Sequence, residues 1–469
     1  MQIWTCASLA RSSYRMATQY RYHVLVMLLL GCTVLVHYSY DVRYLLSLRL
    51  EKEYEGGIQN DTLRTSQLTL APNTTSPLLS APGEEVLTPS GPMFQRINQN
   101  DAWVYSAFFD TYKDKNLIRV FGMQPHALQN LIFCHLGFKH ENYTMEGKRT
   151  LLQDNHGYRL RVVSYECDLI DDRRPDLVSI TWNTSDSPTN SLRVLYPSSL
   201  KRNFTVCYAI LYNFTNYKQI IQSVEFDRIL GAEHFFVYNM SISNTTDALL
   251  RHYQRRGLLT VMQWPLPISE IHYQGQVLAI NDCVYRNKGV SKYVAIHDTD
   301  EIIIPNNHDN WGDLIDQVNK DYDQQKQSPQ SHEKLGTYIV ESTFFQDRPN
   351  ASVWSAIKQN YSISDQVERL FENYSLTVFT DLVRLQNAFV GARQKSIVRP
   401  EMVLFPDVHT TITHRPSATD VTVRQSLALV HHQRKYSSSS PNDIVEATSL
   451  RFKDKMLPLV NETYSMFFT

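Results

Sequence analysis

The sequence predicts an α/β domain over residues 201–469, preceded by a β-rich lead-in region at 96–200. Two observations carry the α/β assignment. Apolar runs that suit buried strands alternate with segments of helical periodicity in the first part of the domain. A cluster of carboxylates then follows the last of these runs, at the sheet edge where open α/β domains bind their ligands.

The alternation of strand and helix periods predicts a mainly parallel sheet with helical crossovers. The first apolar run, "FTVCYAILY", is continuous, as expected of a strand that is covered on both faces. We expect strands at 204–212, 234–238, 258–264 and 293–297, and helices at 217–231, 246–257 and 274–289.

The lead-in region contains short apolar or alternating runs separated by Gly, Asn and Asp, which indicates β-strands. No side chain in it stands out as a candidate for chemistry. The whole chain has 46 Lys and Arg residues against 47 Asp and Glu residues, and the basic ones are scattered. We therefore do not expect the protein to bind nucleic acid.

A membrane anchor is predicted at residues 22–40, "YHVLVMLLLGCTVLVHYSY", which contain no Asp, Glu, Lys or Arg. This is close to the ~20 residues needed to cross a bilayer. Three arginines and no acid precede it, so the positive-inside rule predicts a cytosolic tail at 1–21 and a luminal body. A cleaved signal peptide is the alternative, although "HYSY" is a poor cleavage site.

Residues 41–95 are rich in Pro, Ser and Thr and are predicted to form a flexible stem. An anchor and a stem that hold a luminal domain away from the bilayer occur in many Golgi enzymes and also in receptors. We expect a single-pass type II protein of the Golgi membrane.

Acceptor motifs for N-glycosylation agree with a luminal body because all of them follow the predicted anchor. We expect those inside apolar runs, at Asn203 and Asn213, to stay unused. The twelve motifs begin at Asn60, Asn73, Asn142, Asn183, Asn203, Asn213, Asn239, Asn244, Asn350, Asn360, Asn373 and Asn461.

Four cysteines lie in the predicted luminal part: Cys134, Cys167, Cys207 and Cys283. An even number in an oxidising compartment predicts one or two disulfides, with three possible pairings for the full set. A zinc site made of four thiolates is the alternative, but the spacing contains no CxxC.

The acidic cluster consists of Asp298, Asp300 and Glu301 in "YVAIHDTDEIIIP". Alternate residues of an extended chain point the same way, so Asp298 and Asp300 can converge on one site. Converging carboxylates repel unless a cation or a proton lies between them, and Mn²⁺ or Mg²⁺ suits oxygen ligands. A solvated corner is the alternative, which the apolar runs on both sides disfavour.

The segments "VCYAILYNFTN", "VEFDRILGAEHFFVYN", "YVAIHDTDEIIIP", "ARQKSIVRPEMVLFPDVH" and "ALVHHQRKY" occur in an order that resembles glycosyltransferase family 92. The resemblance runs from about residue 203 to 436, and "YSAFFD" resembles the family's lead-in. It implies a GT-A-type nucleotide-sugar fold and inverting transfer with Mn²⁺. It also implies galactose transfer from UDP-galactose in β linkage, including transfer to the fucose of N-glycan cores.

If the reaction is sugar transfer from a nucleotide diphosphate, a metal would neutralise the leaving diphosphate. We expect Asp300 to bind the metal and Asp298 to bind the metal or the donor ribose. The family pattern places a histidine in two later segments, which gives His409 and either His431 or His432 as further metal ligands. The doubled histidine "HH" departs from that pattern and leaves the register open.

Arg393, Lys395 and Arg399 are candidates for the donor phosphates, and Lys395 matches the family's Lys-Ser-Ile segment. Tyr212 and Asn213, after the first strand, are candidates for the uracil or ribose.

The base that deprotonates the acceptor hydroxyl is expected among Glu341, Asp347 and Asp381, which the sequence does not separate.

The leading hypothesis is thus a Golgi glycosyltransferase with a UDP-sugar donor and a glycan or glycoprotein acceptor. A membrane-anchored carbohydrate-binding or adhesion protein that uses the acids for Ca²⁺ is the rival, and a catalytically silent relative is a third hypothesis. The βαβα order is unexplained by the rival, and the intact acidic motif argues against a silent relative.

Overall fold

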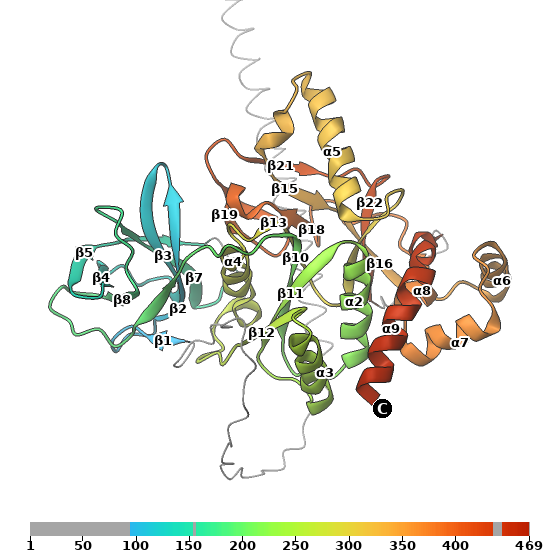
Figure 1. Cartoon of the computed structure of the whole chain (residues 1–469), viewed down its shortest axis with the longest axis horizontal. Helices are drawn as coiled ribbons and strands as arrows, with labels where there is room; N and C mark the ends of the chain where they lie inside the picture. The colour runs from blue at the N-terminus through green and yellow to red at the C-terminus, as the bar shows by residue number, and fades with distance from the viewer. Residues whose placement is uncertain (1–93, 153–155, 435–442, 469) are drawn as a thin grey trace, which may run out of the picture. The chain divides into compact units, whose positions relative to one another are not determined.

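The computed structural model describes residues 94–152, 156–434 and 443–468. The predicted tail, the predicted anchor and nearly all of the predicted stem lie outside these residues and stay predictions. Within the described residues, no helix is both long and apolar enough to span a bilayer. The described chain has a mixed α/β fold (Figure 1).

The lead-in region forms a nine-stranded sheet, and its strands pair antiparallel except for β2 with β9. The strand order is β5-β4-β8-β9-β2-β3-β7-β6, with β1 on β2. A disulfide between Cys134 and Cys167 joins β4 to β7. The strands are β1 (Gln95–Arg96), β2 (Trp103–Tyr112), β3 (Lys115–Pro125), β4 (Phe133–Gly137), β5 (Asn142–Glu146), β6 (Lys148–Leu151), β7 (Leu160–Asp168), β8 (Leu177–Thr181) and β9 (Leu192–Leu195).

A seven-stranded sheet follows, in the order β12-β11-β10-β13-β18-β15-β21. Its first four strands are parallel and alternate along the chain with helices α2, α3 and α4, as the sequence predicts. The elements are β10 (Arg202–Leu211), α2 (Tyr217–Ile229), β11 (Ala232–Asn239), α3 (Asn244–Arg255), β12 (Leu259–Gln263), α4 (Gln276–Arg286), β13 (Ser291–His297), β15 (Leu335–Val340), β18 (Lys395–Val398) and β21 (Thr419–Thr422).

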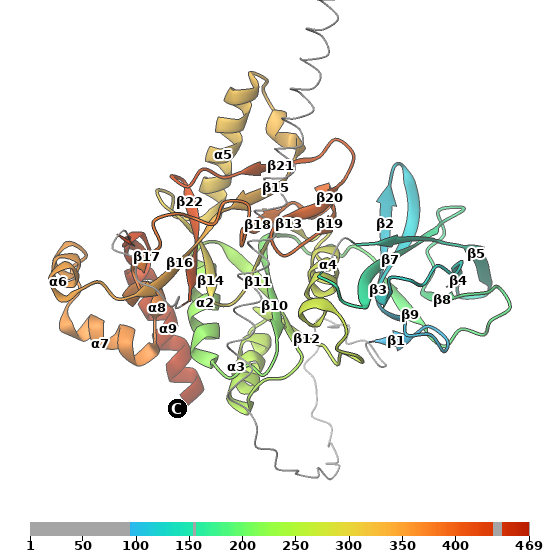
Figure 2. The ribbon, with the colours of Figure 1, turned by 180° about the vertical axis from the view of Figure 1, so that it is seen from behind.

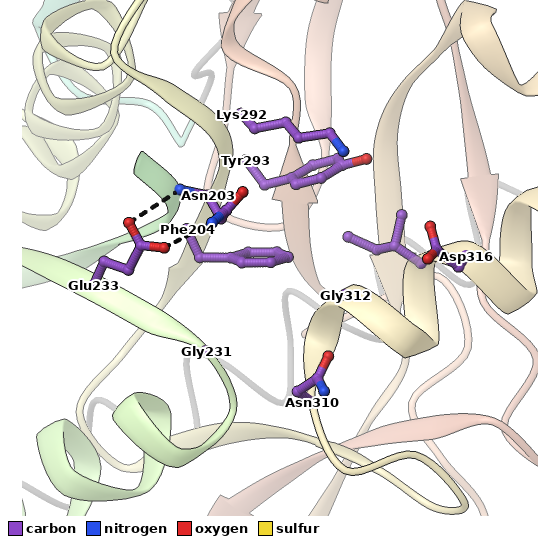
Figure 3. A pocket seen from close by; sticks show the side chains of 10 residues that line it. Asn203, Phe204, Gly231, Glu233, Lys292, Tyr293, Asn310, Gly312 and Asp316 are labelled. Atoms are coloured by element: carbon purple, nitrogen blue, oxygen red, sulfur yellow. Dashed lines mark hydrogen bonds between the residues drawn. The ribbon is translucent and has the colours of Figure 1, made fainter. Parts of the chain in front are cut away.

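Helices α2 and α3 are each followed by a glycine, Gly231 and Gly257, with φ of 113° and 71°. Only glycine adopts such angles without strain, so these positions end the helices. A pocket of about 330 Å³ lies where β10, β11 and β13 begin, opposite the carboxyl ends of the strands (Figure 3).

A smaller five-stranded sheet has the order β14-β22-β16-β17-β23. Helix α9 packs against α2, and Figures 1 and 2 show both beside each other. The remaining elements are β14 (Glu301–Pro305), α5 (Trp311–Lys326), β16 (Ser342–Asp347), α6 (Ala351–Asn360), α7 (Asp365–Tyr374), α8 (Thr377–Thr380), β17 (Val383–Arg384), β19 (Val403–Pro406), β20 (Thr411–His414), β22 (Ala428–Gln433), β23 (Ile444–Val445) and α9 (Lys453–Phe468).

Helix α4 joins the lead-in region to the central sheet. It lies between β2 and β3 on one side and β10 on the other, and its side chains share one apolar core with both (Figures 1 and 2). A second disulfide, Cys207–Cys283, ties β10 to α4. All four cysteines of the predicted luminal part are therefore in disulfides, and the zinc alternative is wrong.

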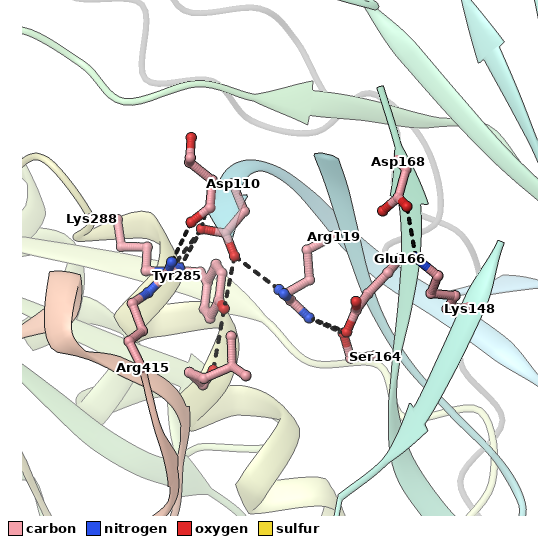
Figure 4. Close-up of polar contacts among 11 residues, drawn as sticks. Asp110, Arg119, Lys148, Ser164, Glu166, Asp168, Tyr285, Lys288 and Arg415 are labelled. Carbon is pink, nitrogen blue, oxygen red and sulfur yellow. Dashed lines mark hydrogen bonds and ion pairs between the residues drawn. The ribbon is translucent and has the colours of Figure 1, made fainter. Parts of the chain in front are cut away.

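A buried carboxylate, Asp110, holds this joint together (Figure 4). It accepts from Arg119 at 3.0 Å, pairs with Lys288 at 3.1 Å and contacts Arg415. Burial raises the pKa of Asp110, but Lys288, Arg119 and Arg415 outweigh that effect and hold it far below its usual range. Burial lowers the pKa of Lys288 to about 7 even though Asp110 opposes the shift. The Asp110 carboxylate thus pairs with three cations: Arg119 of β3, Lys288 in the turn after α4, and Arg415 after β20.

Asp110→Asn is expected to lower the free energy of unfolding by about 3–5 kcal/mol, because it leaves buried cations without their counterion. A carboxyl whose folded pKa is depressed stabilises the fold above its unfolded pKa of about 3.9, and this contribution is lost on acidification. The loss on acidification should therefore be smaller in the variant. Urea unfolding at neutral and acidic pH measures both effects.

The matched control is Asp114→Asn, at an exposed turn position with a φ of 61° that asparagine tolerates. It should stay within about 0.5 kcal/mol of the wild type. Equal stability of the two variants would show that Asp110 does not hold the joint.

Candidate active site

The acidic cluster lies at the carboxyl end of β13, between the neighbouring strands β10 and β18. Carboxylate oxygens of Asp298, Asp300 and Glu301 lie within 4.8 Å of one another. The side chains of Asp298 and Asp300 are 33% and 32% exposed, whereas that of Glu301 is 2% exposed. The structure thus brings the three predicted carboxylates together and leaves two of them open to a ligand.

Lys395, the first residue of β18, is the counterion inside this cluster. Its Nζ lies 3.0 Å from Asp298 Oδ2 and 2.9 Å from Glu301 Oε2, and its side chain is 2% exposed. Burial lowers the pKa of Lys395, but Asp298 and Glu301 outweigh it and hold the pKa above its ordinary value. The ammonium is therefore paired inside the cluster, and the predicted contact of Lys395 with the donor phosphates stays a prediction.

The doubled histidine is resolved by strand register, because Glu301 pairs with His432 and Ile302 with His431. His432 Nδ1 lies 3.2 Å from Glu301 Oε1, and its Nε2 lies 3.4 Å from Asp300 Oδ2. Successive residues of a strand face opposite sides, so His431 points away from the cluster. Of the two histidines that the sequence left open, His432 therefore faces the cluster and His431 does not.

His431 stacks on Phe345 with ring centres 3.9 Å apart, and burial lowers its pKa to about 3. It is a core side chain of the five-stranded sheet.

The cluster fits a divalent cation. Three carboxylates and one ammonium leave a formal charge of −2, which a divalent ion would neutralise. Both ring nitrogens of His432 are buried and make no hydrogen bond to a described residue, and one of them faces Asp300. Burial raises the pKa of Glu301, but the Lys395 ammonium outweighs it and the pKa lies below its usual range. A carboxylate and an imidazole that face each other without hydrogen bonds form a donor set that suits Mn²⁺.

Two glutamines, one from a helix on each face of the sheet, donate hydrogen bonds to the segment that carries the acidic cluster. Gln219, in the first turn of α2, donates to Thr299 Oγ1 at 2.9 Å. Gln276, the first residue of α4, donates to Asp298 Oδ1 at 3.3 Å. Neither residue was predicted as part of the site, and the available signal was a polar side chain in the first turn of each predicted helix.

An unusual turn directly precedes α4. Tyr273, Gln274 and Gly275 are three successive residues with positive φ, at 39°, 53° and 82°. The indole of the fully buried Trp264 donates to the carbonyl of Gln274 at 2.9 Å, and Tyr273 is left 52% exposed. Non-glycine residues in this region carry strain that often accompanies binding sites. No sequence signal predicted this turn.

Arg393 is a cation held by aromatic rings beside the cluster. Its guanidinium lies 5.6 Å from the ring centre of Phe344 and 5.9 Å from that of Phe389. Phe344 in turn meets the ring of His432 edge to face. Within the described part of the chain Arg393 has no ion pair, so its donors are available to an anion. Arg399 instead donates to the carbonyls of Glu333 and Leu335 and has a structural role.

His409 also lies near the cluster. Burial and the Lys395 ammonium lower its pKa to about 4, although Asp298 opposes the shift. Its Nδ1 lies 2.8 Å from the carbonyl of Gln394. A neutral ring that donates through Nδ1 leaves Nε2 as an acceptor, as a metal ligand requires.

Tyr212 and Asn213 follow β10 at the carboxyl edge of the sheet. Tyr212 is 52% exposed, and Asn213 has a φ of 47° with its backbone and side chain bonded to Ser241. Both stay candidates for the nucleoside. Asp282 and Arg286 of α4 form an ion pair with 2.7 Å between Arg286 Nε and Asp282 Oδ2, and they have a structural role.

The three candidates for the base occupy different places. Glu341 is buried, contacts Gln425 and lies three residues before Phe344, the strand partner of His432. That separation corresponds to roughly 10 Å along a strand, away from the cluster. Asp347 is exposed at the other end of β16, and its partner Val383 lies two residues after Asp381. Asp347 lies equally many residues from Phe344, so this spacing does not separate the three, and all of them stay candidates for the base.

A family model described as "Glycosyltransferase family 92" matches residues 202–466, more than half of the chain. The chain belongs to glycosyltransferase family 92. The matched range contains every site residue discussed above, and the resemblance inferred from the sequence is confirmed.

Two similar proteins come from Caenorhabditis elegans. One is "Beta-1,4-galactosyltransferase galt-1", 24% identical over 47% of this chain and 45% of its own length. Another is "Glycosyltransferase family 92 protein F13G3.3", 29% identical over 29% of this chain and 28% of its own length. The chain thus spans less than half the length of these curated relatives.

A solved structure, glucosyl-3-phosphoglycerate synthase from Mycobacterium tuberculosis with Mn²⁺, UDP and glucosyl-3-phosphoglycerate, is 10% identical. The alignment covers 57% of this chain and 80% of that one, with a TM-score of 0.23. At this score nothing about the site is taken from it.

Lys395→Met is expected to lower the free energy of unfolding by about 3–5 kcal/mol, because Asp298 and Glu301 lose the cation between them. Mn²⁺ should restore part of the loss, since the cluster then carries a formal charge of −3. Thermal and urea unfolding with and without Mn²⁺ measure both effects. Lys320→Met, at an exposed position of α5, is the matched control. Unchanged stability of Lys395→Met would contradict its role as counterion.

Proposed function

We propose that this protein is a metal-dependent glycosyltransferase that moves a hexose from a nucleoside-diphosphate sugar to a glycan with inversion. The observation that carries the proposal is the acidic cluster facing His432, with two open carboxylates and a charge that suits a divalent cation. UDP-galactose is the proposed donor, supported by family membership and by the similarity to a protein named as a β-1,4-galactosyltransferase.

The residues divide between metal and donor. Asp300 and His432 would hold Mn²⁺ or Mg²⁺. Asp298 and His409 lie nearby and are further candidates for metal ligands. Bound there, the cation would neutralise the negative charge that develops on the leaving diphosphate. Arg393, fixed over two aromatic rings, is available to phosphate oxygens from the other side. Tyr212 and Asn213 lie at the carboxyl edge, where a nucleoside would extend over β10 and β11.

Inversion requires a single displacement, with the acceptor hydroxyl attacking from the side opposite the diphosphate. Glu341, Asp347 or Asp381 would take the proton from that hydroxyl. The proposed acceptor is a glycan of a glycoprotein, with core fucose as the first to test. The proposed location is the Golgi lumen, with the chain held by the predicted type II anchor.

The first test is titration calorimetry of UDP into the purified luminal part, with Mn²⁺ and with EDTA, followed by a donor panel with fucosylated acceptors. We expect binding that needs the metal and is lost in Asp300→Ala. A folded protein that binds no UDP would sink the proposal, and glycan binding in Ca²⁺ without UDP affinity would favour the carbohydrate-binding rival.

The two neighbouring histidines provide a matched pair. His432→Leu removes a proposed ligand and should weaken Mn²⁺ binding by about tenfold or more, with a similar loss of metal-supported transfer. His431→Leu removes two buried nitrogens that lack partners among the described residues and should leave Mn²⁺ affinity unchanged. Equal Mn²⁺ affinity in the two variants would contradict the assignment of His432.

Arg393→Ala should raise the KM for the UDP-sugar by roughly 10-fold to 100-fold, as expected for loss of a charged hydrogen bond of about 1.5–3 kcal/mol. Arg393→Lys should recover little, because an ammonium does not reproduce the planar guanidinium held over two rings. Initial rates at varied donor concentration give the KM. A KM that is unchanged in Arg393→Ala would remove Arg393 from the donor site.

A further inference from the structure

The pocket of about 330 Å³ lies at the amino ends of the parallel strands, whereas the acidic cluster follows the carboxyl end of β13. Figure 3 shows the side chains that line the pocket. Its apolar wall consists of Phe204, Tyr293 and Ile315, and the first two rings stack with centres 5.1 Å apart. Polar side chains of both charges line the remainder, and two glycines, Gly231 and Gly312, add no bulk. The polar lining residues are Asn203, Glu233, Lys292, Asn310 and Asp316.

Asn203 is the acceptor asparagine of an N-glycosylation motif, Asn203-Phe204-Thr205. Strand alternation places Asn203 outside and Phe204 inside, so the motif is accessible although it begins an apolar run. Its backbone N–H donates to Glu233 Oε2 at 3.1 Å, and its Nδ2 donates to Glu233 Oε1 at 2.8 Å. Glu233 thereby holds the Asn203 amide at the rim of the pocket. It accepts one of the two Nδ2 hydrogens of Asn203 and leaves the other free for the covalent step.

We propose that Asn203 carries an N-linked glycan and that its first sugar, an N-acetylhexosamine, lies in this pocket. In the covalent step, Nδ2 bonds to the anomeric carbon of a lipid-linked oligosaccharide diphosphate. The bond from that carbon to the diphosphate breaks, and Nδ2 loses one proton. The lipid-linked oligosaccharide is the donor, the lipid diphosphate is the leaving group, and the host's oligosaccharide-transferring enzyme catalyses the step. The inference goes beyond sugar transfer by this chain and rests on the luminal location proposed above.

The lining matches the chemistry of a hexosamine. A pyranose has an apolar C–H face that packs on an apolar wall, and hydroxyls that need donors and acceptors around its edge. Phe204, Tyr293 and Ile315 provide the apolar wall for the C–H face. Lys292 provides a donor and Asp316 an acceptor for the hydroxyls. Because glycosylation precedes folding of the strand, Asn203 becomes occupied first and the pocket then closes around the sugar.

The test uses the full chain expressed in a vertebrate secretory host. Site occupancy is measured by mass spectrometry after enzymatic release of the glycans in ¹⁸O water, which marks each formerly glycosylated asparagine. Contrary to the expectation from the apolar run alone, we expect Asn203 to be occupied, because its side chain is exposed. Release by an N-glycosidase from the native protein should be at least about tenfold slower at Asn203 than at Asn142 or Asn360, which is about 1.4 kcal/mol of docking. Both comparison sites are exposed.

A double variant, Lys292→Ala with Asp316→Ala, removes polar partners without touching the motif. Asn203 should stay occupied in it, and its glycan should be released as fast as that of Asn360. An unoccupied Asn203 in a protein whose Asn360 is occupied would overturn the proposal, as would a chain with no glycan at any site. Equal release rates at Asn203 and Asn360 in the wild type would overturn the docked sugar. Transfer activity, assayed in parallel, reports on the proposed function independently.

Discussion

The buried ion pair of Lys395 with Asp298 and Glu301 is the constraint on which the site depends. Three carboxylates this close cannot all ionise inside a protein without a cation between them. The chain supplies that cation from β18, which enters the sheet antiparallel to β13, so that its first residue lies beside the carboxyl end of β13. One ammonium neutralises only one of the three carboxylates, so the cluster keeps a formal charge of −2. This remaining charge suits a divalent cation.

The lead-in region contributes to the site through α4. One end of this helix holds Asp298 through Gln276, and the other end presents Tyr285 and Lys288 to Asp110. The Cys207–Cys283 disulfide fixes the same helix to β10. A displacement of the lead-in sheet would therefore shift α4 and, through Gln276, the position of Asp298. Within the described residues that sheet contributes no side chain to the acidic cluster.

The sequence predicted the parts of the fold that depend on local periodicity. The continuous apolar runs and the helical segments of the first half of the domain appear in the structure where they were expected, and the acidic motif lies at the predicted sheet edge. Register and long-range pairing were not predictable. A one-residue choice between His431 and His432 depends on how β22 pairs with β14, more than a hundred residues earlier in the chain. The ion pair of Lys395 was not predicted for the same reason, since only tertiary structure shows which anion a lysine meets. The turn at Tyr273 has no sequence signal because its strain is held by a distant indole.

The most direct test of the central claim is a crystal structure of the luminal part with Mn²⁺ and UDP, with anomalous data collected at the manganese edge. The account predicts one anomalous peak at bonding distance, roughly 2.0–2.3 Å, from Asp300 Oδ2 and His432 Nε2. The UDP phosphates should lie between that peak and Arg393, with Lys395 still paired to Glu301. A peak coordinated by other side chains, or UDP bound with no metal at Asp300, would contradict it.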